Sequence, residues 1–183
     1  MDAVYELLKG VSARDLTMEA VAKKANVGKP TLYKWWPSKA ALITAMFHER
    51  LSRQPEVTKA TSAEASLRAK MKRLIHECNG LFGKVVADLI AEGQSDPSVL
   101  KALYDNHVRH RRASVVADVK VGIASGEFSE KTDPELMVDA MFAPVYYRLL
   151  LRFAPLTETY GNQLIDQALR WVKTSPSSKQ KHK

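Results

Sequence analysis

The feature that most constrains this chain is residues 17–39, a segment that combines two short helical patterns with a concentration of positive charge. It reads TMEAVAKKANVGKPTLYKWWPSK. Its first half places Met18, Val21 and Ala22 at helical spacing behind Thr17, whose hydroxyl suits an N-cap. Its second half is short, aromatic and basic, and the turn between the halves is too short for a flexible linker. This pattern predicts two helices that meet at a steep angle, as in a helix-turn-helix.

Three positions make the helix-turn-helix interpretation specific. Ala22 falls where the two helices approach most closely and only a small side chain fits, and Leu32 fills the gap from the second helix. Asn26 falls where the turn requires a left-handed backbone, a conformation that asparagine adopts more readily than most residues other than glycine. The alternative interpretation, a basic and solvated helical hairpin, would not need this spacing.

Positive charge is concentrated toward the two ends of the chain. Residues 23–39 contain five lysines and no acidic residue. Of the net charge of +8, residues 1–52 contribute +3, residues 53–174 contribute +2 and residues 175–183 contribute +3. A basic surface around a small apolar core favours a phosphate-bearing partner. We therefore expect the helix-turn-helix segment, residues 17–39, to bind nucleic acid.

This part of the chain resembles the DNA-binding signature of the TetR/AcrR family of bacterial transcription regulators. The similarity rests on VAKKANVGKPTLYKWWPSKAALI, and within it on Ala22, the TLY core of the second helix, the aromatic residue that follows, and then SK with an apolar pair. It spans roughly residues 16–47. The resemblance implies a repressor that binds a palindromic double-stranded DNA operator as a homodimer and is released by a small molecule.

The resemblance also implies roles within the second helix, which would enter the major groove. Lys29, Thr31 and Tyr33 would face the groove, where a lysine can donate to guanine and a threonine methyl can meet a thymine methyl. We expect Trp35 and Trp36 to be packing residues, one of them in the small core. Lys34 would contact a base or a phosphate, and Thr17, Tyr33 and Lys39 would hold the DNA backbone. The predicted DNA-binding residues are Thr17, Gly28, Lys29, Pro30, Thr31, Tyr33, Lys34 and Lys39.

Helical spacing and helix start signals continue through the rest of the chain. Ser38 suits an N-cap, and each of Asp96 and Asp133 precedes a proline at the first helical position. Because no strand pattern of useful length occurs, the sequence predicts an all-α fold of about nine helices, a count that leans on the resemblance. Beyond the helix-turn-helix we expect helices at residues 1–9, 38–51, 63–78, 82–90, 97–125, 135–153 and 157–173, with a loop at 53–62.

We divide the chain into a helix-turn-helix DNA-binding domain (1–47), an effector-binding and dimerisation domain (48–174) and a disordered basic tail (175–183). The predicted helix at residues 135–153 is apolar nearly all round, so it must be buried on two sides. The last helix, at residues 157–173, carries a long apolar stripe of its own. These two helices predict self-association through a four-helix bundle, which the resemblance also implies.

By resemblance, the body of the protein holds an effector pocket. Most of the methionine and aromatic residues at helical spacing should form core, and a minority should line the pocket. Such a pocket would be apolar and rich in methionine, which suits a hydrophobic or aromatic molecule and not a sugar or a nucleotide. The candidate lining residues are Met71, Ile75, Cys78, Phe82, Val86, Leu103, Met137, Met141 and Tyr146.

The sequence lacks the patterns that mark common enzymes. It contains no phosphate-binding glycine loop, no HExxH and no GxSxG. His76, Glu77 and Cys78 are consecutive, and consecutive helical residues point in different directions, so they do not form a nucleophile and its base. His107 and His110 have the spacing of metal ligands on a helix but no obvious third ligand. We therefore expect no catalysis, no cofactor and no metal.

The length of the apolar runs and the cysteine content indicate where the protein is located. The richest apolar run, residues 140–147, is far shorter than the ~20 residues that cross a bilayer, and no leader-like segment begins the chain, so we expect neither a membrane span nor a secretion signal. The single cysteine, Cys78, fits a cytoplasmic protein. The four residues at 109–112 spread around a helix, so we expect them to form a solvated or salt-bridged surface and not a site for an anionic effector or a partner.

The alternative to a ligand-released repressor is an architectural DNA-binding protein without an effector.

Overall fold

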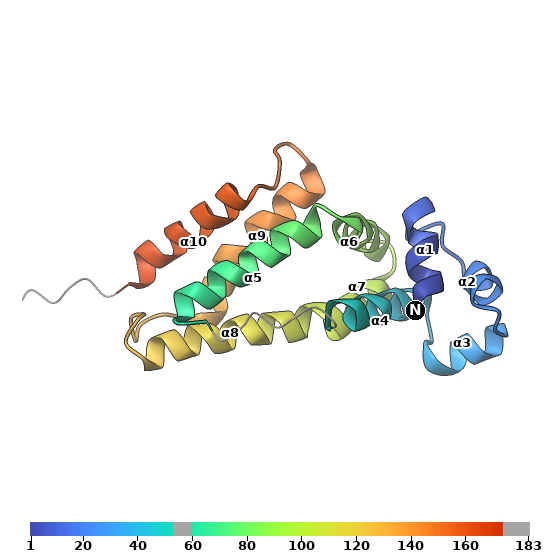
Figure 1. Cartoon of the computed structure of the whole chain (residues 1–183), viewed down its shortest axis with the longest axis horizontal. Helices are drawn as coiled ribbons and strands as arrows, with labels where there is room; N and C mark the ends of the chain where they lie inside the picture. The colour runs from blue at the N-terminus through green and yellow to red at the C-terminus, as the bar shows by residue number, and fades with distance from the viewer. Residues whose placement is uncertain (53–59, 174–183) are drawn as a thin grey trace, which may run out of the picture. The chain divides into compact units, whose positions relative to one another are not determined.

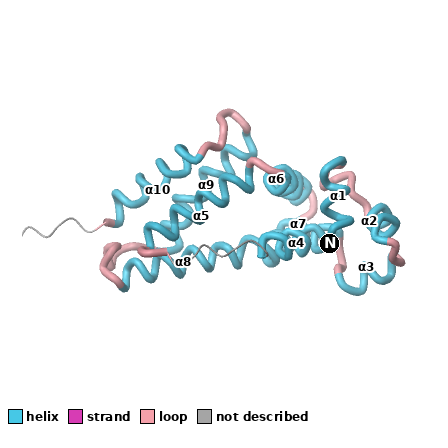
Figure 2. The backbone as a smooth tube through the Cα atoms, in the orientation of Figure 1, coloured by secondary structure: helices cyan, strands magenta, loops and turns pink. Residues whose placement is uncertain are grey.

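The computed structural model describes residues 1–52 and 60–173, and Figure 2 shows that helices joined by loops make up all of this part of the chain. Because residues 97–124 form one unbroken helical stretch that includes a π-helical segment, these ranges hold nine continuous helices. The predicted all-α fold of about nine helices is confirmed. The elements are α1 (Asp2–Gly10), α2 (Met18–Ala25), α3 (Lys29–Trp35), α4 (Lys39–Ser52), α5 (Ala63–Cys78), α6 (Leu81–Gly93), α7 (Pro97–Leu103), η1 (Tyr104–Val108), α8 (Arg109–Ala124), α9 (Pro134–Leu151) and α10 (Glu158–Val172).

The helices pack into two compact units, which are described separately below (Figure 1). Unit 1 contains α1–α4, α6, α7 and η1, together with residues 76–78 at the end of α5 and residues 109–112 at the start of α8. Unit 2 contains the rest of α5 and α8, with α9 and α10. Packing therefore groups the N-terminal helices with α6 and α7, and the functional division expected at residue 47 stays a prediction.

Side-chain caps begin the helices where the sequence predicts them. The hydroxyls of Thr17 and Ser38 accept the backbone N–H groups of the third residue on, at 3.1 Å in both cases. The carboxylates of Asp96 and Asp133 cap α7 and α9 in the same way, each ahead of a proline at the first helical position. Thr157 caps α10. A cap satisfies one of the unpaired N–H groups of a first turn, so each helix start is specified locally.

Helix ends are less well predicted than helix starts. The helix after Asp133 is predicted to reach Phe153, but α9 ends at Leu151 because Arg152 adopts a left-handed backbone with φ of 54°. The predicted long helix from residue 97 includes η1, whose wider turn gives no sequence signal. The predicted loop at 53–62 lies mostly outside the described residues, and residues 60–62 are not helical. The predicted tail at 175–183 also lies outside them.

Unit 1 has a continuous core that supports the N-terminal helices. Leu8 on α1 is fully buried, as are Ile43 and Met46 on α4 and Leu89 on α6. A hydrogen bond from the Ala13 backbone N–H to the Asp88 carboxylate, 3.0 Å long, ties the loop after α1 to α6. Asn106 on η1 donates to the Thr44 hydroxyl on α4 at 3.3 Å. The helix-turn-helix is thus fixed to a larger scaffold.

In unit 2, α9 and α10 lie side by side (Figure 1), and the part of α5 in this unit packs against α10. Leu67, Met71, Met141 and Ile165 are fully buried in its core. Gly161 allows the close approach of α10 to α5, because a Cβ atom there would lie 2.9 Å from the Met71 Cγ atom. None of the helices in the described ranges is long and apolar enough to cross a membrane.

Candidate nucleic-acid interface

The turn between α2 and α3 is fixed by its own backbone. Asn26 adopts a left-handed conformation with φ of 53°, as predicted. Its N–H donates to the Lys23 carbonyl at 3.3 Å, and the Val27 N–H donates to the Ala22 carbonyl at 3.0 Å. This pair of bonds is a Schellman motif, which satisfies the last carbonyls of α2 and reverses the chain. The start of α3 is therefore placed by local geometry.

A small apolar contact holds α3 against α2. Ala22 and Leu32 are both buried, in agreement with the predicted close approach of the two helices. Leu32 is the only residue of the seven in α3 that is buried. Because one side chain anchors the helix, the rest of its surface is left open to a partner.

Seven of the eight predicted DNA-binding residues are exposed. Six of them, residues 28–31, Tyr33 and Lys34, belong to α3 or its N-cap, and the Tyr33 side chain is 48% exposed. The exception is Lys39, which is half-buried at the start of α4. Its ammonium group donates to the Arg14 carbonyl at 2.9 Å and lies 3.2 Å from the Glu92 carboxylate. Lys39 is thus held by partners inside unit 1.

Lys29 has a partner that the sequence does not reveal. Its ammonium group forms an ion pair with the Glu19 carboxylate on α2, although the two residues are ten positions apart. The bond to Lys29 lowers the pKa of Glu19, and the same bond raises the pKa of Lys29. Both groups are fully charged at neutral pH. An acidic residue therefore lies within the surface that the lysine count alone describes as uniformly basic.

Trp35, the last residue of α3, and Trp36, which directly follows it, have different environments. Trp36 is half-buried, as expected for a packing residue. The prediction that Trp35 packs is wrong, because its side chain is 67% exposed. Trp35 lies one turn after Thr31, so the two share a face of α3, and the Lys34 ammonium group lies 6.0 Å from its ring centroid. An exposed indole next to polar groups is a feature of binding surfaces.

A second exposed surface lies on α9 in unit 2, and it is apolar. Leu136, Tyr147 and the neighbouring Leu150 and Leu151 lie on one side of the helix, with Ala140 and Ala143 exposed between Leu136 and Tyr147. Tyr147 contacts Phe153 beyond the helix end, with ring centroids 5.3 Å apart. The exposed large apolar residues of this surface, named the α9 face below, are Leu136, Tyr147, Leu150, Leu151 and Phe153, and Trp171 is exposed on the adjacent α10.

The residues predicted to line an effector pocket lie in the interiors of the two units, and their role in a pocket stays a prediction. Eight of the nine are buried, and Tyr146 is half-buried. Unit 2 holds Met71, Ile75, Met137, Met141 and Tyr146, and the other four, Cys78, Phe82, Val86 and Leu103, belong to unit 1.

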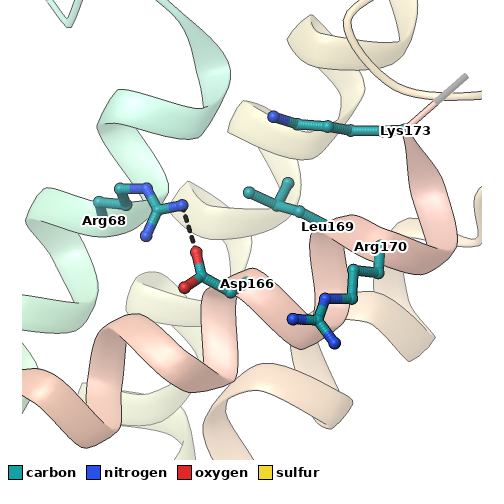
Figure 3. Close-up of a pocket in the computed structure, with 5 residues that line it drawn as sticks. All are labelled: Arg68, Asp166, Leu169, Arg170 and Lys173. Carbon is teal, nitrogen blue, oxygen red and sulfur yellow. Dashed lines mark hydrogen bonds and ion pairs between the residues drawn. The ribbon is translucent and has the colours of Figure 1, made fainter. Parts of the chain in front are cut away.

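A groove of about 300 Å³ on the surface of unit 2 is lined by none of the residues predicted to form the effector pocket (Figure 3). It is lined by Arg68, Asp166, Leu169, Arg170 and Lys173. Arg68 donates to the Asp166 carboxylate at 2.6 Å, the contact drawn in Figure 3. Lys173 and Arg68 also pair with Glu64, and the pKa of Glu64 is lowered mainly by its bond to Lys173. Because two of its three cations already hold carboxylates, the groove is not an open anion site.

A buried polar cluster lies in unit 1, where α5 ends and α8 begins. The Arg111 guanidinium pairs with Glu77, which is buried. His107 on η1 is buried against the Phe82 ring, and burial together with the neighbouring Arg111 lowers its pKa to about 3. Burial raises the pKa of the Cys78 thiol to about 12, so this thiol is not an activated nucleophile.

The basic run at residues 109–112 is salt-bridged in part. Arg111 pairs with Glu77, and the Arg109 guanidinium lies 3.9 Å from the Asp105 carboxylate. The His110 ring lies 6.1 Å from that of His48, between centroids. Among the residues that the structure describes, no group of three or more histidine, cysteine or acidic side chains is placed to hold a metal ion.

Two segments of the chain match known families. Residues 1–46 match the family described as bacterial regulatory proteins, tetR family. Residues 57–168, more than half of the chain, match the family described as Tetracyclin repressor-like, C-terminal domain. The first match contains the exposed helix α3, and the second contains the α9 face.

Individual relatives agree with these family matches. The HTH-type transcriptional regulator YdeS of Bacillus subtilis (strain 168) is 28% identical over 180 residues, which cover 97% of this chain and 90% of the relative. The crystal structure of the TetR family transcription regulator SCO0332 is 28% identical with a TM-score of 0.81 and covers 95% of both chains. The regulator FadR from Bacillus subtilis, solved in complex with stearoyl-CoA, shares the fold at 17% identity, with a TM-score of 0.68 over 92% of this chain and 95% of that one.

Proposed function

This chain belongs to the TetR family of bacterial transcription regulators, and we propose that it is a cytoplasmic repressor that binds a palindromic DNA operator as a homodimer and is released by a hydrophobic small molecule. The family and the relatives are DNA-binding transcription regulators and not enzymes. The operator, the dimer and the effector are our proposals. The observation that carries the proposed DNA binding is the exposed polar surface of α3, in which Leu32 is the single buried residue.

The chemistry of the exposed α3 surface supports direct reading of a major groove. Lys29 can donate to guanine acceptors, and the Thr31 methyl can contact a thymine methyl. Tyr33 offers a hydroxyl to a phosphate, as Lys34 offers an ammonium group. Trp35 extends the Thr31 face and can cover a thymine methyl or a deoxyribose with its indole. We include Trp35 among the proposed DNA-contacting residues.

The α9 face supports the proposed homodimer. A row of exposed leucine and aromatic side chains on one helix exceeds what a soluble monomer usually leaves open to water. Two copies that pair α9 and α10 with their counterparts would form a four-helix bundle and cover this face on both subunits. Such a two-fold dimer would present two α3 helices to half-sites about one DNA turn apart, or a multiple of it. The operator should therefore be an inverted repeat.

The proposed effector is hydrophobic or aromatic. The support is the apolar, methionine-rich interior of unit 2, where Met71, Met137 and Met141 are buried. Methionine side chains repack around ligands at low cost. FadR, which shares this fold, was solved with stearoyl-CoA, a ligand with a long acyl chain. We expect hydrophobic compounds to raise the melting temperature of the protein and to abolish operator binding, and stabilisation by polar compounds alone would refute this part of the proposal.

The repressor role is supported by the family description, which is that of a repressor-like C-terminal domain. The competing function is an architectural DNA-binding protein without an effector. Such a protein would show weak sequence preference and a steep salt dependence, whereas a regulator should prefer its operator by a factor of about 10³ or more over random DNA.

The direct test replaces Lys29 and Tyr33 by alanine. Each variant should lose about 1–3 kcal/mol of specific binding and keep its fold, because neither side chain is part of the core. Fluorescence anisotropy measures the loss, with an operator that the wild-type protein selects from a library of random duplexes. Tyr104→Ala is a matched control, since Tyr104 is also 48% exposed but lies on η1. Lys101→Ala is the control for the lysine, because Lys101 is exposed and ion-paired on α7. Unchanged affinity in both test variants would overturn the assignment.

A further inference from the structure

Glu19 is an acidic residue in direct contact with the proposed DNA-reading surface, through Lys29. It lies in the first turn of α2, two residues after the Thr17 cap, and its side chain is 61% exposed. Its carboxylate holds the ammonium group of Lys29 at the start of α3. The ion pair therefore joins the two helices of the helix-turn-helix across their outer surface.

A carboxylate at this place is unfavourable for simple attraction to DNA. Non-specific binding depends on the number of phosphates that lysine and arginine neutralise, and each such contact releases counterions. Glu19 removes one positive charge from this count, because Lys29 is already paired. It also adds a negative charge that a phosphate would repel. An exposed ion pair contributes little to stability, so stability alone gives no reason for a carboxylate here.

The same carboxylate favours one specific geometry of Lys29. A lysine side chain is long and flexible, so a free Lys29 could reach a phosphate or several base edges at similar cost. Held by Glu19, its ammonium group keeps two remaining donors in a restricted position in front of α3. A guanine acceptor at that position completes the arrangement, whereas a phosphate elsewhere can be reached only by breaking the ion pair.

We propose that Glu19 is a specificity-determining residue that positions Lys29 for a base acceptor and prevents its use as a general phosphate contact. The inference rests on the proposed function, in which Lys29 faces the major groove. Glu19 acts through Lys29, so it is a positioning residue. Its removal should weaken discrimination between the operator and other DNA while leaving overall DNA binding intact or stronger.

The test compares Glu19→Gln with Glu6→Gln. Both changes remove one negative charge from the N-terminal helices, and Glu6 is a matched control because it is 50% exposed and ion-paired with Lys9 on α1. Affinities for the selected operator and for a random duplex are measured by anisotropy at several salt concentrations. We expect Glu19→Gln to bind random DNA about threefold more tightly, with a salt slope steeper by about one, and to lose about threefold in the preference for operator. Glu6→Gln should leave the preference unchanged.

The double variant Glu19→Gln/Lys29→Gln separates positioning from simple repulsion. If Glu19 acts through Lys29, adding Glu19→Gln to Lys29→Gln should not change the operator preference further. An additional change in the double variant, an equal effect of Glu6→Gln, or an unchanged preference in Glu19→Gln would each overturn the inference. Failure of Lys29→Ala to weaken operator binding would instead overturn the assignment of Lys29 on which the inference rests, so the two failures are distinguishable.

Discussion

The surface of α3 and the α9 face both leave large side chains exposed, but their chemistry differs. On α3, lysines alternate with tyrosine, threonine and tryptophan around a single buried leucine. On α9, leucines and tyrosine are exposed on one side while five apolar residues are buried on the other. The exposure of large side chains alone therefore does not indicate whether a surface binds DNA or protein. Mixed polar and aromatic groups suit DNA, and a continuous apolar row suits a second protein surface.

The largest expected effect comes from breaking the α9 face. Tyr147→Glu places a charge in the centre of this face, where the exposed fraction of Tyr147 is 58%. We expect a monomer in analytical ultracentrifugation. Because a monomer engages one half-site at a time, operator affinity should fall by between about 100- and 10,000-fold.

Val121→Glu is the matched control for this experiment. Val121 is 61% exposed in unit 2 but lies on α8 and not on α9 or α10. It should remain dimeric with normal operator affinity. A dimeric Tyr147→Glu variant, or a Val121→Glu variant that is equally monomeric, would contradict the assignment of the interface.

The next effect concerns a buried group that belongs to neither surface. Because the fold keeps His107 neutral down to a pKa of about 3, against 6.5 for an ordinary histidine, the unfolded chain binds more protons between these values. The free energy of unfolding should therefore fall on acidification from pH 6.5 toward pH 3, by about 1.4 kcal/mol per pH unit from this residue.

His107→Leu tests this expectation. Chemical denaturation at pH 6.5 and pH 4.5 should show a smaller acid loss in the variant than in the wild type. Operator affinity at neutral pH should stay the same, since His107 contacts no proposed partner. An equal acid loss in both proteins would show that other groups account for the pH dependence.

A smaller effect is expected from Trp35, the aromatic member of the α3 surface. Trp35→Ala should weaken operator binding about five- to tenfold, because the exposed indole would lose its contact with a base or sugar. Trp35→Phe should retain most of the affinity. Thermal melts should be unchanged, since the residue is 67% exposed. Normal operator binding by Trp35→Ala would remove this residue from the proposed interface.

The smallest expected effect on DNA affinity comes from Lys34 and Lys39, which should differ in their effect on the melting temperature. Lys39 is expected to hold the DNA backbone, and we propose a phosphate contact for Lys34 as well. Glutamine at either position should therefore lower affinity for all sequences by about threefold and flatten the salt dependence. Only Lys39→Gln should also lower the melting temperature, because it leaves Glu92 and the Arg14 carbonyl without their lysine partner. A lower melting temperature with unchanged DNA affinity would assign Lys39 a purely structural role.

Local signals made much of this fold predictable from the sequence. Caps such as Thr17 and Ser38, and the left-handed turn at Asn26, depend on a few neighbouring residues, and all three are observed. The π-helical turn of η1 was not predictable, because no residue type marks it. The Glu19–Lys29 pair was missed because it connects residues ten positions apart through the turn.

The site was predictable where a pattern limits which side of a helix is exposed. Leu32 had to be buried, so its neighbours on α3 had to be exposed, as observed. Spacing could not decide which of Trp35 and Trp36 packs, because adjacent residues near a helix end can each reach the core. Lys39 was expected from resemblance alone, and its internal partners depend on the position of α6.

The central claim is that two α3 helices of a symmetric dimer read one operator. The most direct measurement is selection of bound duplexes from a random DNA library by the full chain, followed by titration of the selected site. We expect an inverted repeat, with half-sites about one helical turn or a multiple of it apart, bound about 10³-fold or more tightly than random DNA. Recovery of no preferred sequence, or of a single half-site without symmetry, would contradict it.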